Sequence, residues 1–120
     1  MKNDDITEHI IGGAFEVYNE LGYGFLEKVY QRALLVELIN RGLDAQSEHR
    51  IQVHYKNVTV GEYQADLFVE GRVIVELKIS IEYNRRDEAQ ILNELKATRV
   101  KIGLLINFGA RKVEFKRLIY

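Results

Sequence analysis

Residues 65–78 read Ala-Asp-Leu-Phe-Val-Glu-Gly-Arg-Val-Ile-Val-Glu-Leu-Lys. The apolar runs on either side of residues 70–72 predict two strands joined by a turn. Charged side chains interrupt both runs: Asp66 lies on the first strand, and Glu76 and Lys78 lie on the second. A charge in an apolar strand costs more than a charge on a surface helix or loop, so these three residues need an explanation.

The strand register can be predicted from the apolar residues. Antiparallel pairing that sets each small or apolar residue opposite another joins Val69 to Val73, Leu67 to Val75 and Ala65 to Leu77. A slip of one residue would set apolar side chains against charged ones. The same register puts Asp66 directly opposite Glu76, with Lys78 on the same face. Two carboxylates at this spacing raise each other's proton affinity unless a cation joins them.

Two explanations of this charged cluster stand side by side. The first is a site for Mg²⁺ or Mn²⁺, with oxygen ligands from Asp66, Glu76 and the backbone carbonyl of Leu77. The metal would activate a water and polarise a phosphodiester, while Lys78 would orient that water or stabilise developing charge. The second is a structural ion pair across the strands, between Lys78 and one of the two acids. The three charged residues alone do not decide between them.

The remaining segments predict an α/β domain. Apolar residues at helical spacing predict helices over 4–21 and 26–40, the second capped by Gly42. The further elements are strands around 51–55, 58–69 (bent near Gly61) and 73–79, a helix from Asp87 as its cap to 98, and strands over 102–108 and 112–119. The order α-α-β-β-β-α-β-β implies a mixed sheet flanked by helices. The third helix should place 102–107 parallel to 73–79.

Composition narrows the class of protein. A chain of 120 residues has the length of one domain. It has no cysteine, which excludes disulfides, thiol nucleophiles and thiolate zinc sites and fits a cytoplasmic protein. The three histidines lack zinc-ligand spacing. No apolar run reaches the ~20 residues of a membrane span, and the start Met-Lys-Asn-Asp-Asp-Ile does not have the pattern expected of a secretory signal.

Charge is distributed unevenly along the chain. The net charge is −1, yet residues 1–80 carry 8 Lys/Arg against 13 Asp/Glu, and residues 81–120 carry 9 against 5. The basic C-terminal third could form a surface that faces phosphates. Scattered solubilising charge explains the same counts equally well.

The segment Gly24-Phe-Leu-Glu27-Lys-Val-Tyr30 matches the Gly-x-x-Glu-x-x-Tyr signature of the GxxExxY proteins. Further stretches that resemble this family are Tyr63-Gln-Ala-Asp66-Leu, Val75-Glu-Leu-Lys78, Glu88-Ala-Gln90-Ile-Leu-Asn93, Leu95-Lys-Ala-Thr98 and Gly103-Leu-Leu-Ile-Asn-Phe-Gly109. The family is grouped with the PD-(D/E)XK nuclease superfamily. The resemblance therefore implies a restriction-endonuclease-like fold, with residues 1–120 forming a single PD-(D/E)XK nuclease-like domain.

The resemblance also implies a role for particular residues. Asp66 and Glu76 would be the principal metal ligands, and Lys78 the catalytic lysine. Glu27 would complete the metal site from the early helix over the sheet. Gln90 would match the catalytic-site glutamine found on the following helix in one branch of the superfamily.

Each of the helical residues also has an ordinary structural explanation. Tyr30 would support Glu27 or would simply be a core residue. Glu27 in a first helical turn stabilises the helix dipole, and Gln90, three residues after Asp87, fits a capping box. The chain departs from the pattern at Glu94, where the branch with the helical glutamine often has tyrosine, and at Ala65, where the superfamily nominally has proline.

The sequence thus predicts a Mg²⁺- or Mn²⁺-dependent nuclease that hydrolyses phosphodiester bonds, with DNA favoured over RNA and no membrane partner. The alternative is a catalytically silent nuclease-like module that binds nucleic acid or a protein as a homo-oligomer. A homodimer could bring two basic C-terminal thirds beside one duplex.

Overall fold

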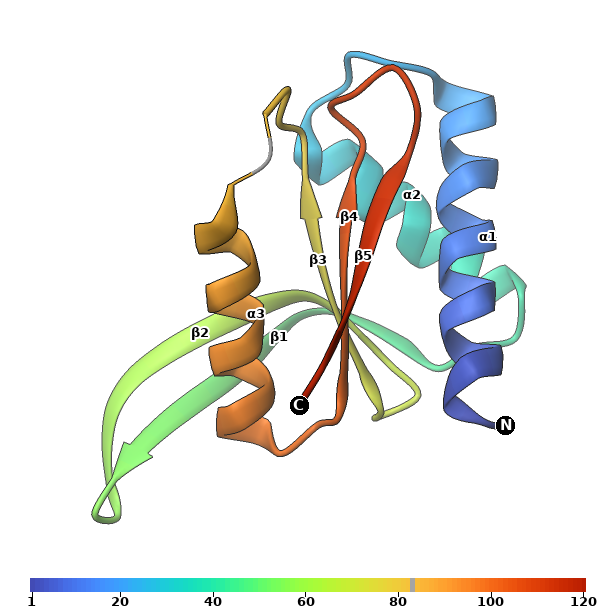
Figure 1. Cartoon of the computed structure of the whole chain (residues 1–120). Coiled ribbons are helices and arrows are strands. Elements are labelled where there is room, and N and C mark those ends of the chain that lie inside the picture. Colours follow the sequence, from blue (N-terminus) through green and yellow to red (C-terminus); the bar gives the residue numbers. More distant parts are fainter. Residues whose placement is uncertain (83) are drawn as a thin grey trace.

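The computed structural model describes residues 1–82 and 84–120. The elements are α1 (Asn3–Leu21), α2 (Glu27–Asn40), β1 (Ala45–Tyr55), β2 (Val58–Val69), β3 (Val73–Lys78), α3 (Arg85–Thr98), β4 (Ile102–Asn107) and β5 (Glu114–Ile119). This is the predicted order, and the strands form one five-stranded sheet in the order β1-β2-β3-β4-β5 (Figure 1). Among the strands of the described residues, only β3 and β4 pair in parallel, as predicted; the other neighbours are antiparallel. None of the helices in the described ranges is long and apolar enough to cross a membrane.

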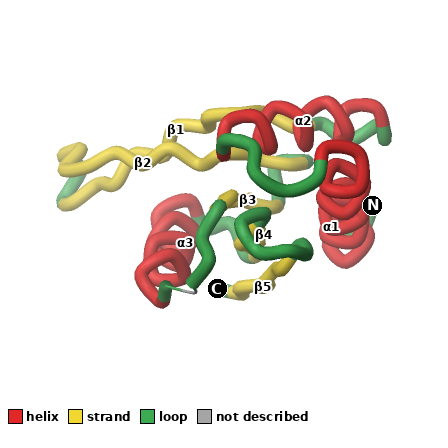
Figure 2. Tube along the Cα trace, turned by 90° about the horizontal axis from the view of Figure 1, so that it is seen from above, coloured by secondary structure: helices red, strands yellow, loops and turns green. Residues whose placement is uncertain are grey.

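Helices cover the sheet from both sides. Figure 2 shows α1 and α3 on opposite sides of β3 and β4. The larger core joins α1 and α2 to one face of the sheet through fully buried residues such as Ile10 and Leu34. The smaller core joins α3 to the other face, where Ile91 and Leu95 pack with Ile74. Five consecutive residues of β3, from Val73 to Leu77, are buried, and the apolar ones are shared between the two cores, as expected of a central strand in an α/β sheet.

The β1–β2 hairpin extends well beyond the other strands (Figure 1). Lys56 and Asn57 both have positive φ (48° and 67°), which suits the tight turn of a two-residue hairpin. The bend expected near Gly61 is present as a register shift between Val53 and His54, opposite Gly61. We refer to residues 48–66, the part of the hairpin beyond its pairing with β3, as the arm.

The predicted register between β2 and β3 is confirmed where the two strands pair. The ladder joins Leu67 to Val75, Phe68 to Ile74 and Val69 to Val73. It ends there, so the expected pairing of Ala65 with Leu77 and of Asp66 with Glu76 is wrong. The reason is that β2 leaves β3 to follow β1 into the arm, and side chains take over the bonding at the point of separation.

The start of α3 also differs from the prediction. Asn84, not Asp87, is the N-cap, and its Oδ1 accepts a hydrogen bond from the backbone N–H of Arg86 at 2.9 Å. Asp87 lies inside the first turn. An Asn side chain at the cap satisfies one of the free amides of the first turn, which removes the need for a cap further along. A capping box headed by Asp87 therefore does not explain Gln90.

Candidate functional site

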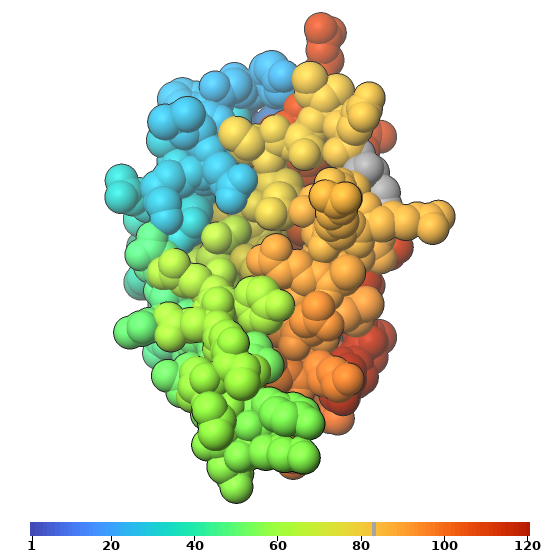
Figure 3. Space-filling view, turned by 90° about the vertical axis from the view of Figure 1, so that its left-hand side faces the viewer, coloured from blue at the N-terminus to red at the C-terminus, as the bar shows by residue number. Residues whose placement is uncertain are grey.

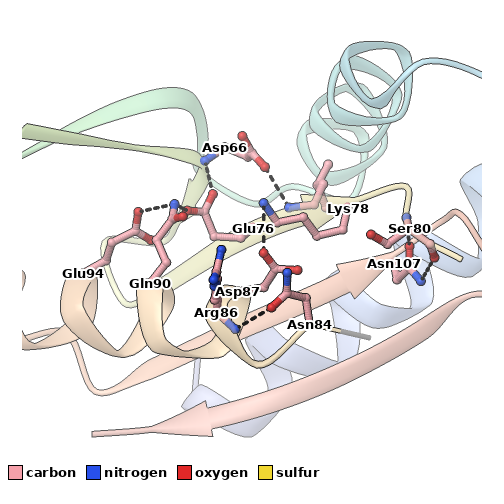
Figure 4. A network of polar contacts seen from close by, with 11 residues as sticks. Asp66, Glu76, Lys78, Ser80, Asn84, Arg86, Asp87, Gln90, Glu94 and Asn107 are labelled. Carbon is pink, nitrogen blue, oxygen red and sulfur yellow. Dashed lines mark hydrogen bonds and ion pairs between the residues drawn. The ribbon is translucent and has the colours of Figure 1, made fainter. Parts of the chain in front are cut away.

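Asp66 and Glu76 face each other where β2 and β3 separate (Figure 4). The backbone N–H of Asp66 donates to Glu76 Oε1 at 2.9 Å, and the backbone N–H of Leu77 donates to Asp66 Oδ2 at 2.7 Å. These bonds replace the ladder that ends one residue earlier. Each carboxylate is therefore held by a backbone amide of the opposite strand. These two bonds use Glu76 Oε1 and Asp66 Oδ2 and do not involve Glu76 Oε2 or Asp66 Oδ1.

The two carboxylates lie in an environment that disfavours negative charge. Glu76 is only 4% exposed. Burial, followed by the hydrogen bond and charge of Glu94 and the charge of Asp66, raises the pKa of Glu76 to about 10. Burial also raises the pKa of Asp66, although the Leu77 amide and the charge of Lys78 oppose this effect. The cluster thus holds more carboxylate than the surrounding residues can neutralise.

Glu94 is a member of this cluster that the sequence-based site did not include. It is fully buried, and burial raises its pKa. Within the described residues its Oε1 has no hydrogen-bond partner, whereas unpartnered buried oxygens are rare in folded proteins. A signal was present in the sequence: Glu94 lies four residues after Gln90, hence on the same face of the helix, next to the apolar Leu95.

Gln90 reaches the carboxylates from α3. Its Nε2 lies 3.4 Å from Glu76 Oε2 and 3.5 Å from Glu94 Oε2 (Figure 4). The amide thus spans the two buried acids and donates toward both at long range. The structure brings this predicted residue to one predicted acid, Glu76, and its helix was predicted correctly even though the helix cap was not.

Lys78 lies at the end of β3, beside the same acids. Its Nζ is 3.6 Å from Asp87 Oδ1, and in residues 1–82 and 84–120 it makes no ion pair with Asp66 or Glu76. The structural explanation based on a cross-strand ion pair is therefore wrong. Its positive charge still lowers the pKa of Asp66, so Lys78 stands near the carboxylates without being bound to them.

Glu27 opens α2 and is half-buried above the site. Burial is the largest cause of its raised pKa, followed by the charge of Asp66, while the charge of Lys78 acts in the opposite direction. Glu27 therefore lies within electrostatic reach of two predicted site residues that are far away in sequence. Its position in the first turn also favours α2 through the helix dipole.

Tyr30 supports the loop that precedes Glu27. Its ring is fully buried and stacks on Phe108 with centroids 4.6 Å apart. Its hydroxyl donates to the carbonyl of Gly22 at 2.5 Å and accepts from the N–H of Phe25 at 3.3 Å. Tyr30 is thus a core residue, and its hydroxyl also holds the loop that precedes Glu27 through two hydrogen bonds.

Gln31, the next residue, is a second one that the sequence did not single out. It is buried, and its Nε2 donates to the backbone carbonyl of Asp66 at 3.3 Å. This bond ties α2 to β2 at the site itself. A polar residue beside a core tyrosine on a helix was the only signal available for it.

The oxygen-rich donor set suits a hard cation. Asp66, Glu76, Glu27 and Glu94 offer carboxylate oxygens of the kind Mg²⁺ and Mn²⁺ prefer. The buried, unpartnered oxygen of Glu94 and the raised pKa of Glu76 fit a place where positive charge would be stabilising. Within the described ranges, no three such side chains already stand in an arrangement that could hold a metal ion.

Comparison with known proteins gives the family. A family model described as the PD-(D/E)XK nuclease superfamily matches residues 4–118. Among solved structures, the crystal structure of SSO0001 is similar, with a TM-score of 0.60 and 15% identity; the match covers 97% of this chain and 58% of that one. At that identity the likeness concerns the fold alone. No match was found among curated proteins. The family model spans nearly the whole chain and all the strands and helices described above, so the chain belongs to the PD-(D/E)XK nuclease superfamily.

Proposed function

We propose that this chain is a Mg²⁺- or Mn²⁺-dependent nuclease of the GxxExxY type that hydrolyses phosphodiester bonds in DNA. The observation that carries the proposal is the pair Asp66 and Glu76. Backbone amides hold the buried Glu76 and the partly buried Asp66 face to face, where β2 and β3 separate. A fold gains no stability from two such acids, because their repulsion and desolvation oppose it. A bound cation would offset the repulsion between the acids, and a phosphate substrate could bind to that cation.

The cation would be held by Asp66, Glu76, the backbone carbonyl of Leu77 and Glu27. Its contribution when bound would be to lower the pKa of a water and to polarise the phosphodiester. The chain's own contribution is to hold the acids still. Asp66 is fixed by the Leu77 amide, and Gln31 fixes its backbone from the other side.

Lys78 and Gln90 would act on the reacting groups. The positive charge of Lys78 is close enough to lower the pKa of Asp66, and its contact with Asp87 is 3.6 Å long. It would stabilise negative charge on the phosphate or orient the attacking water. Gln90 already donates toward Glu76 and would keep that carboxylate turned toward β2.

The enzyme is tested by cleavage of labelled single- and double-stranded DNA with Mg²⁺ or Mn²⁺. Asp66→Asn and Lys78→Gln should each lower the rate by at least about 100-fold, as removal of a group that stabilises transition-state charge does. Lys112→Gln removes an exposed charge in the loop before β5 and should leave the rate unchanged. Equal rates in all variants, or cleavage that persists in EDTA, would contradict the proposal. RNA of the same sequence, as a second substrate, would test the preference for DNA.

The alternative is a catalytically silent module that binds nucleic acid or a protein as a homo-oligomer. The observation in its favour is that, in residues 1–82 and 84–120, the acids are not arranged as a ready metal site. A silent module should bind without cleaving and should show no calorimetric heat on titration with Mn²⁺. Sedimentation would show whether the binding species is a homodimer.

A further inference from the structure

A groove lies between the arm and α3, on the face of the molecule shown in Figure 3. In that view the arm is green and α3 is orange, and they lie side by side in the lower half. The groove has a volume of about 440 Å³, within the range of about 300–1,000 Å³ typical of ligand-binding clefts. Its walls include Val53, His54 and Tyr63 from the arm, and Asn93, Lys96 and Arg99 from α3 and its C-terminal end.

The two walls differ in chemistry. The arm contributes an exposed aromatic ring, since Tyr63 is 37% exposed, beside the apolar Val53 and the imidazole of His54. The α3 side contributes the cations of Lys96 and Arg99. Proteins bind single-stranded nucleic acid by combining aromatic rings, on which bases stack, with cations that contact phosphates, and here one tyrosine ring faces two cations. In a duplex the bases are already stacked, so the arm wall would have nothing to bind.

The cations of the groove are available for a ligand. Lys96 and Arg99 make no ion pair within the described residues, and no acid lines the groove. By contrast, Arg117 of the basic C-terminal third bonds Asp4 at 2.6 Å. Of the basic residues in the C-terminal third, Lys96 of α3 and Arg99 just after it line the groove.

The two walls of the groove come from elements that also carry members of the carboxylate cluster, β2 with Asp66 and α3 with Glu94. Tyr63 precedes Asp66 by three residues on β2, a distance of about 10 Å along a strand. On the other wall, Asn93 and Lys96 flank Glu94 on α3. Both walls therefore lie within a few residues of the cluster along their own elements.

We propose that this groove binds single-stranded nucleic acid and directs it to the carboxylates. Bases contact Tyr63 and Val53, and phosphates contact Lys96 and Arg99. That the nucleic acid is directed to the carboxylates rests on the proposed nuclease function. That it binds in the groove does not. A single strand or a frayed end is therefore the substrate that this chain accepts.

The test is fluorescence anisotropy of a short labelled single strand, in EDTA so that binding is measured without cleavage. The charge variant is Lys96→Gln with Arg99→Asn; Asn is chosen because residue 99 has φ of 61°, a conformation that Asn tolerates. Losing two phosphate contacts should reduce the slope of log affinity against log salt by about 1.4. Tyr63→Leu should weaken binding by about tenfold through lost stacking.

The matched control is Arg111→Gln with Lys112→Gln, which removes the same charge from the exposed loop before β5. It should bind the single strand as the unmodified chain does, and thermal melts should show that all variants fold. The inference is overturned if the charge variant and the control bind alike, or if the matching duplex or a polyglutamate peptide binds more tightly than the single strand. If the groove variants bind the single strand more weakly than the control does, but nothing is cleaved when Mn²⁺ is added, the nuclease proposal fails and the proposed binding in the groove is retained.

Discussion

At the scale of single residues, the feature that matters most is the cluster of poorly neutralised carboxylates between β2, β3 and α3. Glu76 and Glu94 are almost completely buried, and Gln90 is the amide that spans them. Asp66 and Glu76 were identified from the sequence because they interrupt two apolar strands and match the motif of the family that the chain resembles. Glu94 was not, because a helical pattern shows only which face a residue is on. Whether that face meets another acid depends on how α3 packs against β3.

The buried acids make a pH dependence of stability testable. The folded chain raises the pKa of Glu76 from 4.5 to about 10, so between these values the folded state binds a proton that the unfolded state has released. The free energy of unfolding of the metal-free protein should therefore be greatest below pH 4.5, as far as this group is concerned, and should fall as the pH rises toward 10. Urea titrations across that window in EDTA measure it.

Glu76→Gln should flatten this dependence, because Gln does not titrate. A smaller slope of the same sign should remain from Glu94, whose pKa is also raised. Glu16→Gln, on the exposed side of α1, is the matched control and should retain the full slope. A metal-free protein that gains stability between pH 4.5 and 10, with Glu76→Gln unchanged from it, would contradict the electrostatic account.

At the scale of elements, α3 and the end of the β2–β3 ladder position the site. The order of elements and the parallel pairing of β3 with β4 followed from periodicity, because each segment had a clear apolar pattern and a turn at each end. The point where β2 separates from β3 could not be predicted from periodicity. Continued pairing through Asp66 and Glu76 satisfied the apolar pattern equally well. The bonds that replace it join a side chain to the opposite backbone, which a residue pattern does not encode.

The cap of α3 gives a prediction at this scale. Asn84→Ala should lower the free energy of unfolding by about 1 kcal/mol, because the amide of Arg86 loses its partner. Asn84→Ser keeps a capping oxygen and should restore most of that loss, as urea titration would show. A cap at Asp87, as first expected, would instead leave Asn84→Ala without effect.

At the scale of the whole molecule, a small domain carries one long projection. The extents are 46 × 33 × 21 Å, and the arm accounts for the projection visible in Figure 1. The sequence predicted the hairpin, its turn and its bend, yet it did not reveal that the arm lies against α3. That arrangement creates the groove, whose cations are Lys96 and Arg99.

The central claim is that Asp66 and Glu76 hold a divalent cation, and a crystal soaked in Mn²⁺ tests it most directly. The account predicts an anomalous difference peak between the two carboxylates, about 2.1 Å from an oxygen of each. It also predicts that the same peak is lost in Asp66→Asn. A well-ordered site with no peak there, or a peak held only by other residues, would contradict it.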